Sequence, residues 1–312
     1  MNIEPVKNHS PTATKPRFRL GYDKTTGLLL ISPWLVGFLL FKLLPILASF
    51  GLSFTNFYLL EPGQTRFVGL ENYARLLQDE AVGFLIVATI STAVGTIPLQ
   101  LVASTLLAAL LSSPRLKART ALRTLFFLPS IIPSVAILFM WFGFADPNVG
   151  WLNRFILRPL GLTGFNNLYT DAAYAMLIAI NSLWAIGPGM LIMLAAMQSV
   201  STEIQEAARV DGAGPLFRFF RITLPLITPA IFFALVINLI AVFGGVILLD
   251  RGNTFRGGAS PFDSYITYWI FERWELGYAA SLAWLFFTLV MIVVVFLFTT
   301  SRRWVYYPDQ RP

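Results

Sequence analysis

The sequence predicts an all-α integral membrane protein with six transmembrane helices. Of its 312 residues, 56% are hydrophobic and only 12% are charged, whereas soluble domains carry about 25% charged residues. Long stretches without charge recur along the chain, and roughly 20 apolar residues are enough to cross a bilayer as a helix. We predict spans at residues 27–55, 82–112, 124–145, 172–197, 226–249 and 277–300.

The first 24 residues are predicted to be a basic cytoplasmic tail. They contain Lys7, Lys15, Arg17, Arg19 and Lys24. The tail lacks the short apolar region and the small-residue cleavage site of a signal peptide. We therefore expect the first apolar run to remain in the chain as a span. The absence of cysteine excludes disulfides.

The distribution of charge predicts the orientation in the membrane. Of the 23 lysines and arginines, 15 lie in the segments expected inside and 7 in those expected outside. The inner segments are residues 1–26, 113–123, 198–225 and 301–312, and the outer ones are residues 56–80, 146–171 and 250–279. Cytoplasmic loops are enriched in Lys and Arg, so both termini are expected in the cytoplasm. The same rule explains the net charge of +7 without a nucleic-acid partner.

The outer segments carry two further patterns. In residues 67–80, apolar side chains at Leu70, Tyr73, Leu76 and Leu77 recur at helical spacing, which predicts an amphipathic helix on the outer surface. Aromatic residues gather in the other outer segments: Trp151, Tyr169, Tyr265, Tyr268, Trp269 and Trp274. We interpret them as an interfacial aromatic belt, with sugar stacking as the alternative.

The loop between the fourth and fifth predicted spans contains a short charged helix. Thr202 and Gln205 fit a capping box that would start it. Glu206 lies near its amino end, where the helix dipole favours negative charge. Gly212 weakens the helix, and Pro215 stops its hydrogen-bonding pattern. About three turns of helix are therefore expected on the cytoplasmic side.

This helix is suited to docking. Ala207, Ala208 and Gly212 have almost no side chain, so the backbone of another protein can approach closely. Glu206 projects a charge that an Arg or Lys of the partner can bind.

The loop resembles the EAA loop of carbohydrate-type ABC importer permeases, the binding-protein-dependent family of maltose, glycerol phosphate and trehalose transport. The matching residues are EAARVDGAG at 206–214 and ITLPLITP at 222–229. Three further stretches are similar to the same family: residues 44–57, 67–77 and 123–136. The chain departs from the family pattern at residues 249–265, where the outer loop carries Gly257-Gly258-Ala259 and extra polar residues.

The resemblance implies a type I ABC importer permease fold, with residues 25–312 as the permease domain and 198–225 as the coupling loop. It implies that an ATPase docks on Glu206, Ala207, Ala208, Asp211 and Gly212. The expected partners are a second homologous permease subunit, two copies of a cytoplasmic ATPase, an extracytoplasmic solute-binding protein and membrane lipid. The chain itself is expected to be no enzyme and to hold no cofactor, with ATP and Mg on the ATPase.

Missing residue types agree with an external energy source. No G-x-x-x-x-G-K-[ST] phosphate loop occurs. The single histidine, His9, lies in the tail, so histidine catalysis and histidine metal sites are unsupported. The predicted spans contain no Asp or Glu, whereas ion-coupled carriers often place carboxylates at mid-membrane.

Four polar residues within the spans are candidates for the substrate path: Lys42, Asn181, Trp184 and Asn238. Lys42 either reaches toward the outer surface or faces the path. The amides and the indole either bind sugar hydroxyls and a sugar face or join neighbouring helices by hydrogen bonds. We expect a sugar or oligosaccharide as the transported solute. The alternatives are a polyol phosphate or phosphodiester and, in another class, an ion-coupled carrier or membrane enzyme.

Overall fold

The computed structural model describes residues 24–113, 116–133, 149–161, 184, 186–243 and 261–307, together with residues 136, 137, 140, 143, 144 and 146. The described residues are mostly helical. Among them, β structure is limited to isolated bridges, such as that between Thr55 and Phe67. The chain divides into two compact units, residues 1–49 and 50–312, and each unit is described by itself below.

The first unit is one apolar helical segment. It consists of α1 (Lys24–Phe38), the π-helical turn η1 (Leu39–Leu43) and α2 (Leu44–Leu52), which continues into the second unit. Residues 27–52 are long and apolar enough to span a membrane. Their side chains are largely exposed, including Leu30 at 78% and Phe41 at 78%. Lys42 lies on η1 and is also exposed.

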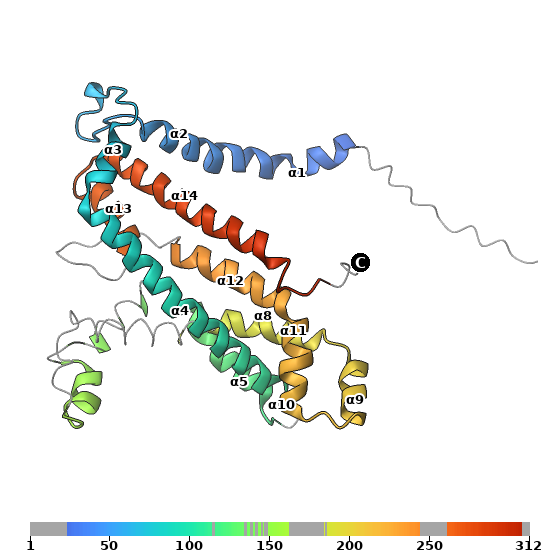
Figure 1. Ribbon diagram of the computed structural model, residues 1–312. Coiled ribbons are helices and arrows are strands. Elements are labelled where there is room, and N and C mark those ends of the chain that lie inside the picture. The colour runs from blue at the N-terminus through green and yellow to red at the C-terminus, as the bar shows by residue number, and fades with distance from the viewer. Residues whose placement is uncertain are drawn as a thin grey trace, which may run out of the picture. The chain divides into compact units, whose positions relative to one another are not determined.

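The second unit contains the remaining helices (Figure 1). Their bounds are η2 (Pro62–Gln64), α3 (Glu71–Gln78), α4 (Glu80–Ser112), α5 (Arg119–Phe127), η3 (Leu128–Ile131), η4 (Asn153–Leu157), α8 (Gly187–Gln198), α9 (Thr202–Val210), α10 (Pro215–Arg218), η6 (Phe219–Thr223), α11 (Leu224–Leu226), α12 (Thr228–Phe243), α13 (Pro261–Phe271) and α14 (Leu276–Ser301).

Helix α4 is the longest of the described helices in this unit. Its 33 residues correspond to about 50 Å of helix. Several of its hydroxyl groups are satisfied within the helix, since those of Thr92, Thr96 and Thr105 donate to backbone carbonyls four residues earlier. Such bonding lets hydroxyl groups enter an apolar environment at little cost. Helices α8, α12 and α13 all pack along α4 (Figure 1).

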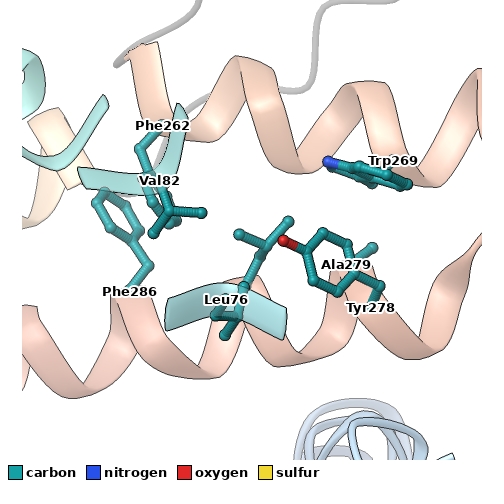
Figure 2. Close-up of a cluster of buried hydrophobic side chains, with 8 residues drawn as sticks. Leu76, Val82, Phe262, Trp269, Tyr278, Ala279 and Phe286 are labelled. Carbon is teal, nitrogen blue, oxygen red and sulfur yellow. The ribbon is translucent and has the colours of Figure 1, made fainter. Parts of the chain in front are cut away.

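Two buried clusters lie at different levels of α4. One joins α4 to α8 and to the start of α12, with Ala108, Leu111, Met190, Met193, Leu194, Ile227 and Ala234. The other joins α3 and α4 to α13 and α14, with Leu76, Val82, Phe262, Trp269, Tyr278, Ala279, Leu282 and Phe286. In Figure 2, Phe262 and Trp269 on one helix lie opposite Phe286 and Tyr278 on the next. The rings of Phe262 and Phe286 stack with their centroids 4.7 Å apart.

Part of the predicted set of six spans falls within the described residues. Among the described residues, three helices are long and apolar enough to cross a membrane: residues 27–52, 80–112 and 276–301. A fourth candidate is a pair of helices, Pro215–Leu226 and Thr228–Ala241, which meet at an angle of 64°. Much of the predicted span at 172–197 and parts of those at 124–145 and 226–249 lie outside the described residues. Six spans therefore stay a prediction.

The amphipathic helix expected in residues 67–80 is present as α3. Leu76 is buried on it and Tyr73 is half-buried, but Leu77 is 91% exposed and Leu70 is 68% exposed. The polar residue Asn72 does much of the anchoring, because its side-chain amide donates to the carbonyls of Ser53 and Thr55, at 2.8 Å each. The Asn72 side chain therefore attaches α3 to the stretch that contains Ser53 and Thr55, within the second unit.

The aromatic-belt interpretation is wrong for the residues of α13 that pack inward. Trp269 is 7% exposed and lies edge-on against Tyr278, with their centroids 4.7 Å apart. The Tyr265 hydroxyl donates to the Asp79 carboxylate at 2.6 Å. The start of α13 contacts α4 about ten residues after Asp79, where the Phe262 amide donates to the Thr89 hydroxyl at 3.2 Å. These α13 side chains pack against neighbouring helices, and a sequence pattern does not show which helices will be neighbours.

Gly277 lies where α14 meets the segment that precedes α3. The Gly277 amide donates to the Phe57 carbonyl at 3.1 Å. A Cβ atom on Gly277 would overlap the carbonyl oxygen of Thr55.

We expect Gly277→Ala to lower the free energy of unfolding by about 2 kcal/mol, because the backbone of α14 must move away from its partner. Gly83→Ala is the matched control, since a Cβ atom on Gly83 meets nothing within 4 Å. Thermal unfolding of the purified protein in detergent would compare the two variants. Equal midpoints would contradict this account of the contact.

The Asp79 carboxylate connects three helices. One of its oxygens accepts from the Ala81 amide at 3.0 Å and caps α4. The other accepts from the hydroxyls of Tyr265 and Tyr278, at 2.6 and 2.8 Å. The Arg75 guanidinium lies over the Tyr278 ring at 4.0 Å and pairs with Glu275 at 2.7 Å.

These contacts set the acid–base behaviour of Asp79. Burial acts to raise the pKa of its carboxyl, but the hydrogen bonds from Tyr265, Tyr278 and the Ala81 amide outweigh that effect. The positive charge of Arg75 adds to the lowering, so the pKa of Asp79 lies below its usual value. A carboxyl whose pKa falls on folding stabilises the fold above its unfolded pKa, about 3.9, and the stabilisation is lost as the pH falls through the folded pKa.

We therefore expect Asp79→Asn to destabilise the protein at pH 7 by on the order of 1 kcal/mol, a modest value because the carboxyl is only partly buried. The difference from the parent should shrink below about pH 4. Unfolding midpoints at pH 7 and pH 3 would check this expectation, with the exposed Glu61→Gln as control. A difference that does not depend on pH would show that the charge of Asp79 is not responsible.

Candidate functional site: the charged loop between α8 and α12

The short charged helix predicted from the sequence is present as α9, and both of its ends are capped. At the amino end, the Ser201 hydroxyl accepts from the Glu203 amide at 3.2 Å. The prediction of Thr202 as the capping residue is therefore wrong by one position, because Thr202 is the first residue of the helix. Both residues carry a hydroxyl, so the sequence pattern alone does not distinguish them.

The carboxyl end of α9 is a Schellman turn. Gly212 has a φ angle of +79°, in the left-handed region that glycine occupies without strain. The Ala213 amide donates to the Ala208 carbonyl at 2.9 Å, and the Gly212 amide donates to the Arg209 carbonyl at 3.1 Å. These two bonds define the motif and satisfy carbonyls that the helix end would leave free. Gly212 thus fixes the point at which the chain reverses.

The helix after the turn holds α9 in place. α10 starts at Pro215 and continues through η6 and α11 to Leu226, and it lies beside α9 in Figure 1. The Gln205 side-chain amide donates to the Thr223 hydroxyl at 3.0 Å. The Arg218 guanidinium donates to the Gln205 carbonyl at 3.4 Å. Gln205 therefore joins two helices instead of closing the predicted capping box.

The residues predicted to couple to an ATPase lie together on this loop. Glu206, Ala207, Asp211 and Gly212 are exposed and Ala208 is half-buried. None of the described residues forms an ion pair with Glu206. A hollow of about 460 Å³ opens beside them, lined by Ala208, Asp211, Gly212, Ala213, Gly214, Phe217 and Ile222. Val210 next to the hollow is 88% exposed, and Phe217 within it is 58% exposed.

The loop is connected to the helices through a bent joint at residues 227 and 228. Pro229 has no amide hydrogen to give to the carbonyl of Pro225, four residues earlier. The Thr228 hydroxyl donates to that carbonyl instead, at 2.6 Å. Ile227 is 1% exposed and belongs to the buried cluster with α4 and α8. The joint is therefore both hydrogen-bonded and packed.

Two residues of the site have roles that were not predicted from the sequence: Gln205, which bonds α9 to the following helix, and Thr228, which forms part of the bent joint. The signal for Thr228 is its place between Pro225 and Pro229, since the second proline leaves a carbonyl that a neighbouring hydroxyl can satisfy. The bond from Gln205 to Thr223 joins residues 18 apart, and no local pattern indicates it.

Three of the four residues predicted for the substrate path lie among the described residues. Lys42 is exposed on η1 in the first unit. Trp184 is half-buried before α8, and Asn238 is half-buried on α12 beside the buried Leu239. Asn181 lies outside the described residues. Their role in a substrate path stays a prediction. Among the described residues, no group of three or more His, Asp or Glu could hold a metal ion.

Comparison with known proteins gives one consistent result. The family model described as "Binding-protein-dependent transport system inner membrane component" matches residues 100–307, which include the whole charged loop. The probable ABC transporter permease protein YesP of Bacillus subtilis is 34% identical over 299 residues, covering 92% of this chain and 94% of that protein.

Two other relatives cover most of the chain. The trehalose/maltose transport system permease protein MalF of Thermococcus litoralis is 31% identical, covering 88% of this chain and 93% of that protein. The sn-glycerol-3-phosphate transport system permease protein UgpA of Yersinia pestis is 31% identical, covering 87% and 88%.

Solved structures share the fold. A chain of a bacterial ABC transporter involved in the import of the acidic polysaccharide alginate superposes with a TM-score of 0.76. It is 25% identical, and the match covers 91% of this chain and 99% of that chain. The family resemblance expected from the EAA loop is confirmed, and this chain belongs to the inner-membrane permease components of binding-protein-dependent transport systems.

Proposed function

We propose that this chain is one of two permease subunits of an ATP-driven importer and forms half of the translocation pathway for a sugar or oligosaccharide. Its family membership is the observation that carries the proposal. One relative is named for trehalose and maltose transport, and a solved neighbour imports alginate. Membership of this family also removes the ion-coupled carrier and the membrane enzyme as alternatives.

In this proposal, α9 is the coupling helix that a cytoplasmic ATPase binds. Its exposed surface supports that role, because Glu206 is available to an arginine or lysine and the nearby hollow is open to a projecting side chain. The bracing of α9 by Gln205 supports it as well, since a loop held to the following helix transmits a displacement as a rigid body.

The whole assembly then contains this chain, a second homologous permease, two ATPase subunits and an extracytoplasmic solute-binding protein. ATP and Mg bind to the ATPases. The chain lies in the cell membrane with both termini in the cytoplasm. Exposed apolar side chains along α4, such as Phe84 at 73% and Val94 at 67%, support contact with lipid or with the second permease.

Replacing Glu206 tests the docking surface. We expect Glu206→Arg to weaken ATPase binding about tenfold, because a charge-assisted hydrogen bond contributes roughly 1.5–3 kcal/mol. The measurement is the amount of ATPase that copurifies with the tagged chain from native membranes at matched expression. Glu272→Arg is the matched control, since Glu272 is also exposed but follows α13 far along the chain from the loop.

Retention of the ATPase by Glu206→Arg at the level of Glu272→Arg would contradict a role for Glu206. Filling the hollow provides a second test through Ala208→Phe, which we expect to reduce copurification without involving charge. Failure of the parent chain itself to retain any ATPase would contradict the proposed function as a whole.

A polyol phosphate or phosphodiester is the second candidate solute, favoured by the similarity to the glycerol-3-phosphate permease. Mass spectrometry of the ligand on the copurified solute-binding protein separates the two classes, because only one of them contains phosphorus. Lys42, Trp184 and Asn238, with Asn181, are the residues we propose for the substrate path.

A further inference from the structure

Residues 302–307, which follow α14 and which we call the C-terminal hook, turn back from the end of α14 onto the start of α12. Val305 in the hook is 6% exposed, and its amide donates to the carbonyl of Ser301 at 2.8 Å. The Trp304 ring lies 5.6 Å from that of Phe232 on α12. Phe232 also contacts Phe298 on α14, with their centroids 5.0 Å apart. An aromatic cluster thus joins the inner ends of α12 and α14.

The hook also completes the joint between the charged loop and α12. The Thr228 hydroxyl donates its hydrogen to Pro225 at 2.6 Å, so only its lone pairs remain for another partner. The Tyr306 amide supplies that partner by donating to the hydroxyl oxygen at 2.9 Å. The chain Tyr306–Thr228–Pro225 therefore links the hook to the helix that braces α9.

The position of this chain of bonds matters mechanically. Thr228 is the first residue after the 64° bend between the helix of residues 215–226 and α12. A proline removes one of the regular hydrogen bonds of a helix, so the remaining helical bonds do not fix the angle of the bend. Hydrogen bonds from both sides of the bend, together with buried Ile227, supply that restraint here.

We infer that the C-terminal hook holds this bend, so that the charged loop, α12 and the inner half of α14 move as one body when an ATPase displaces α9. Tyr306 and Thr228 are positioning residues in this scheme, acting through the joint and not on the solute. The inference rests on the proposed function, because it requires an ATPase on α9.

Substitution at position 306 isolates the backbone donor. Tyr306→Pro removes the amide hydrogen that Thr228 accepts, whereas Tyr306→Ala removes the ring and keeps that hydrogen. The chain has no cysteine, so Arg209→Cys on α9 and Phe296→Cys on α14 provide two label sites, both exposed. The distance between spin labels is measured in the assembled complex, without nucleotide and after trapping with MgATP and vanadate. A complex without these two cysteines gives the background from partner subunits.

With the parent hook and with Tyr306→Ala, we expect trapping to change the label distance by less than about 2 Å. With Tyr306→Pro, we expect a change of roughly 5 Å and a broader distribution, because the bend is released. A result for Tyr306→Pro equal to that of the parent overturns the inference, as does a result for Tyr306→Ala equal to that of Tyr306→Pro.

Thr228→Val gives the same test if Tyr306→Pro does not assemble. Its matched control is Thr288→Val, because the Thr288 hydroxyl donates to the Trp284 carbonyl within α14, at 2.8 Å, away from the bend. We expect the larger distance change with Thr228→Val alone, and equal changes in both variants overturn the inference. If no ATPase copurifies with the parent chain, the proposed function fails and the inference fails with it. An ATPase that is present and trapped, with no effect of either variant at the bend, refutes the inference alone.

Discussion

Backbone polar groups that enter an apolar layer must bond within the protein, and this constraint governs the structure. Helix α4 meets it over 33 residues, with threonine hydroxyls bonded to its own carbonyls. The helix therefore offers a largely apolar surface along its whole length. Helices α8, α12 and α13 pack on that surface, and the two large buried clusters form where they do.

The same constraint explains the places where the regular helix fails. Pro229 leaves the Pro225 carbonyl without its usual donor, and the Thr228 hydroxyl takes that place at 2.6 Å. Gly212 ends α9 with two bonds that satisfy its last carbonyls. At both of these breaks, hydrogen bonds satisfy the backbone carbonyls that the helix would leave free, and the loop therefore has a defined shape. A defined shape is what a partner needs to bind it without a large entropic cost.

Two regions of the second unit, one around Asp79 and one around Ile227, are held by different chemistry. Around Asp79, a carboxylate, two tyrosine hydroxyls and the Arg75 guanidinium form a charged and hydrogen-bonded group. Around Ile227, the contacts are mainly apolar and include Met190 and Leu194. The polar group depends on the protonation of one carboxyl, whereas the apolar group depends on close packing.

The sequence by itself determined the membrane class, the family and the presence of the short charged helix between two apolar runs. These properties depend on composition and on patterns within about ten residues, such as the EAARVDGAG segment of residues 206–214. Only the tertiary structure decided that Ser201 caps α9, that Gln205 bonds to Thr223 and that Trp269 packs inward. It also decided that Tyr306 reaches Thr228, 78 residues earlier in the chain. Contacts over such separations depend on which helices pack together, because helical periodicity specifies a buried face and not the residue that will cover it.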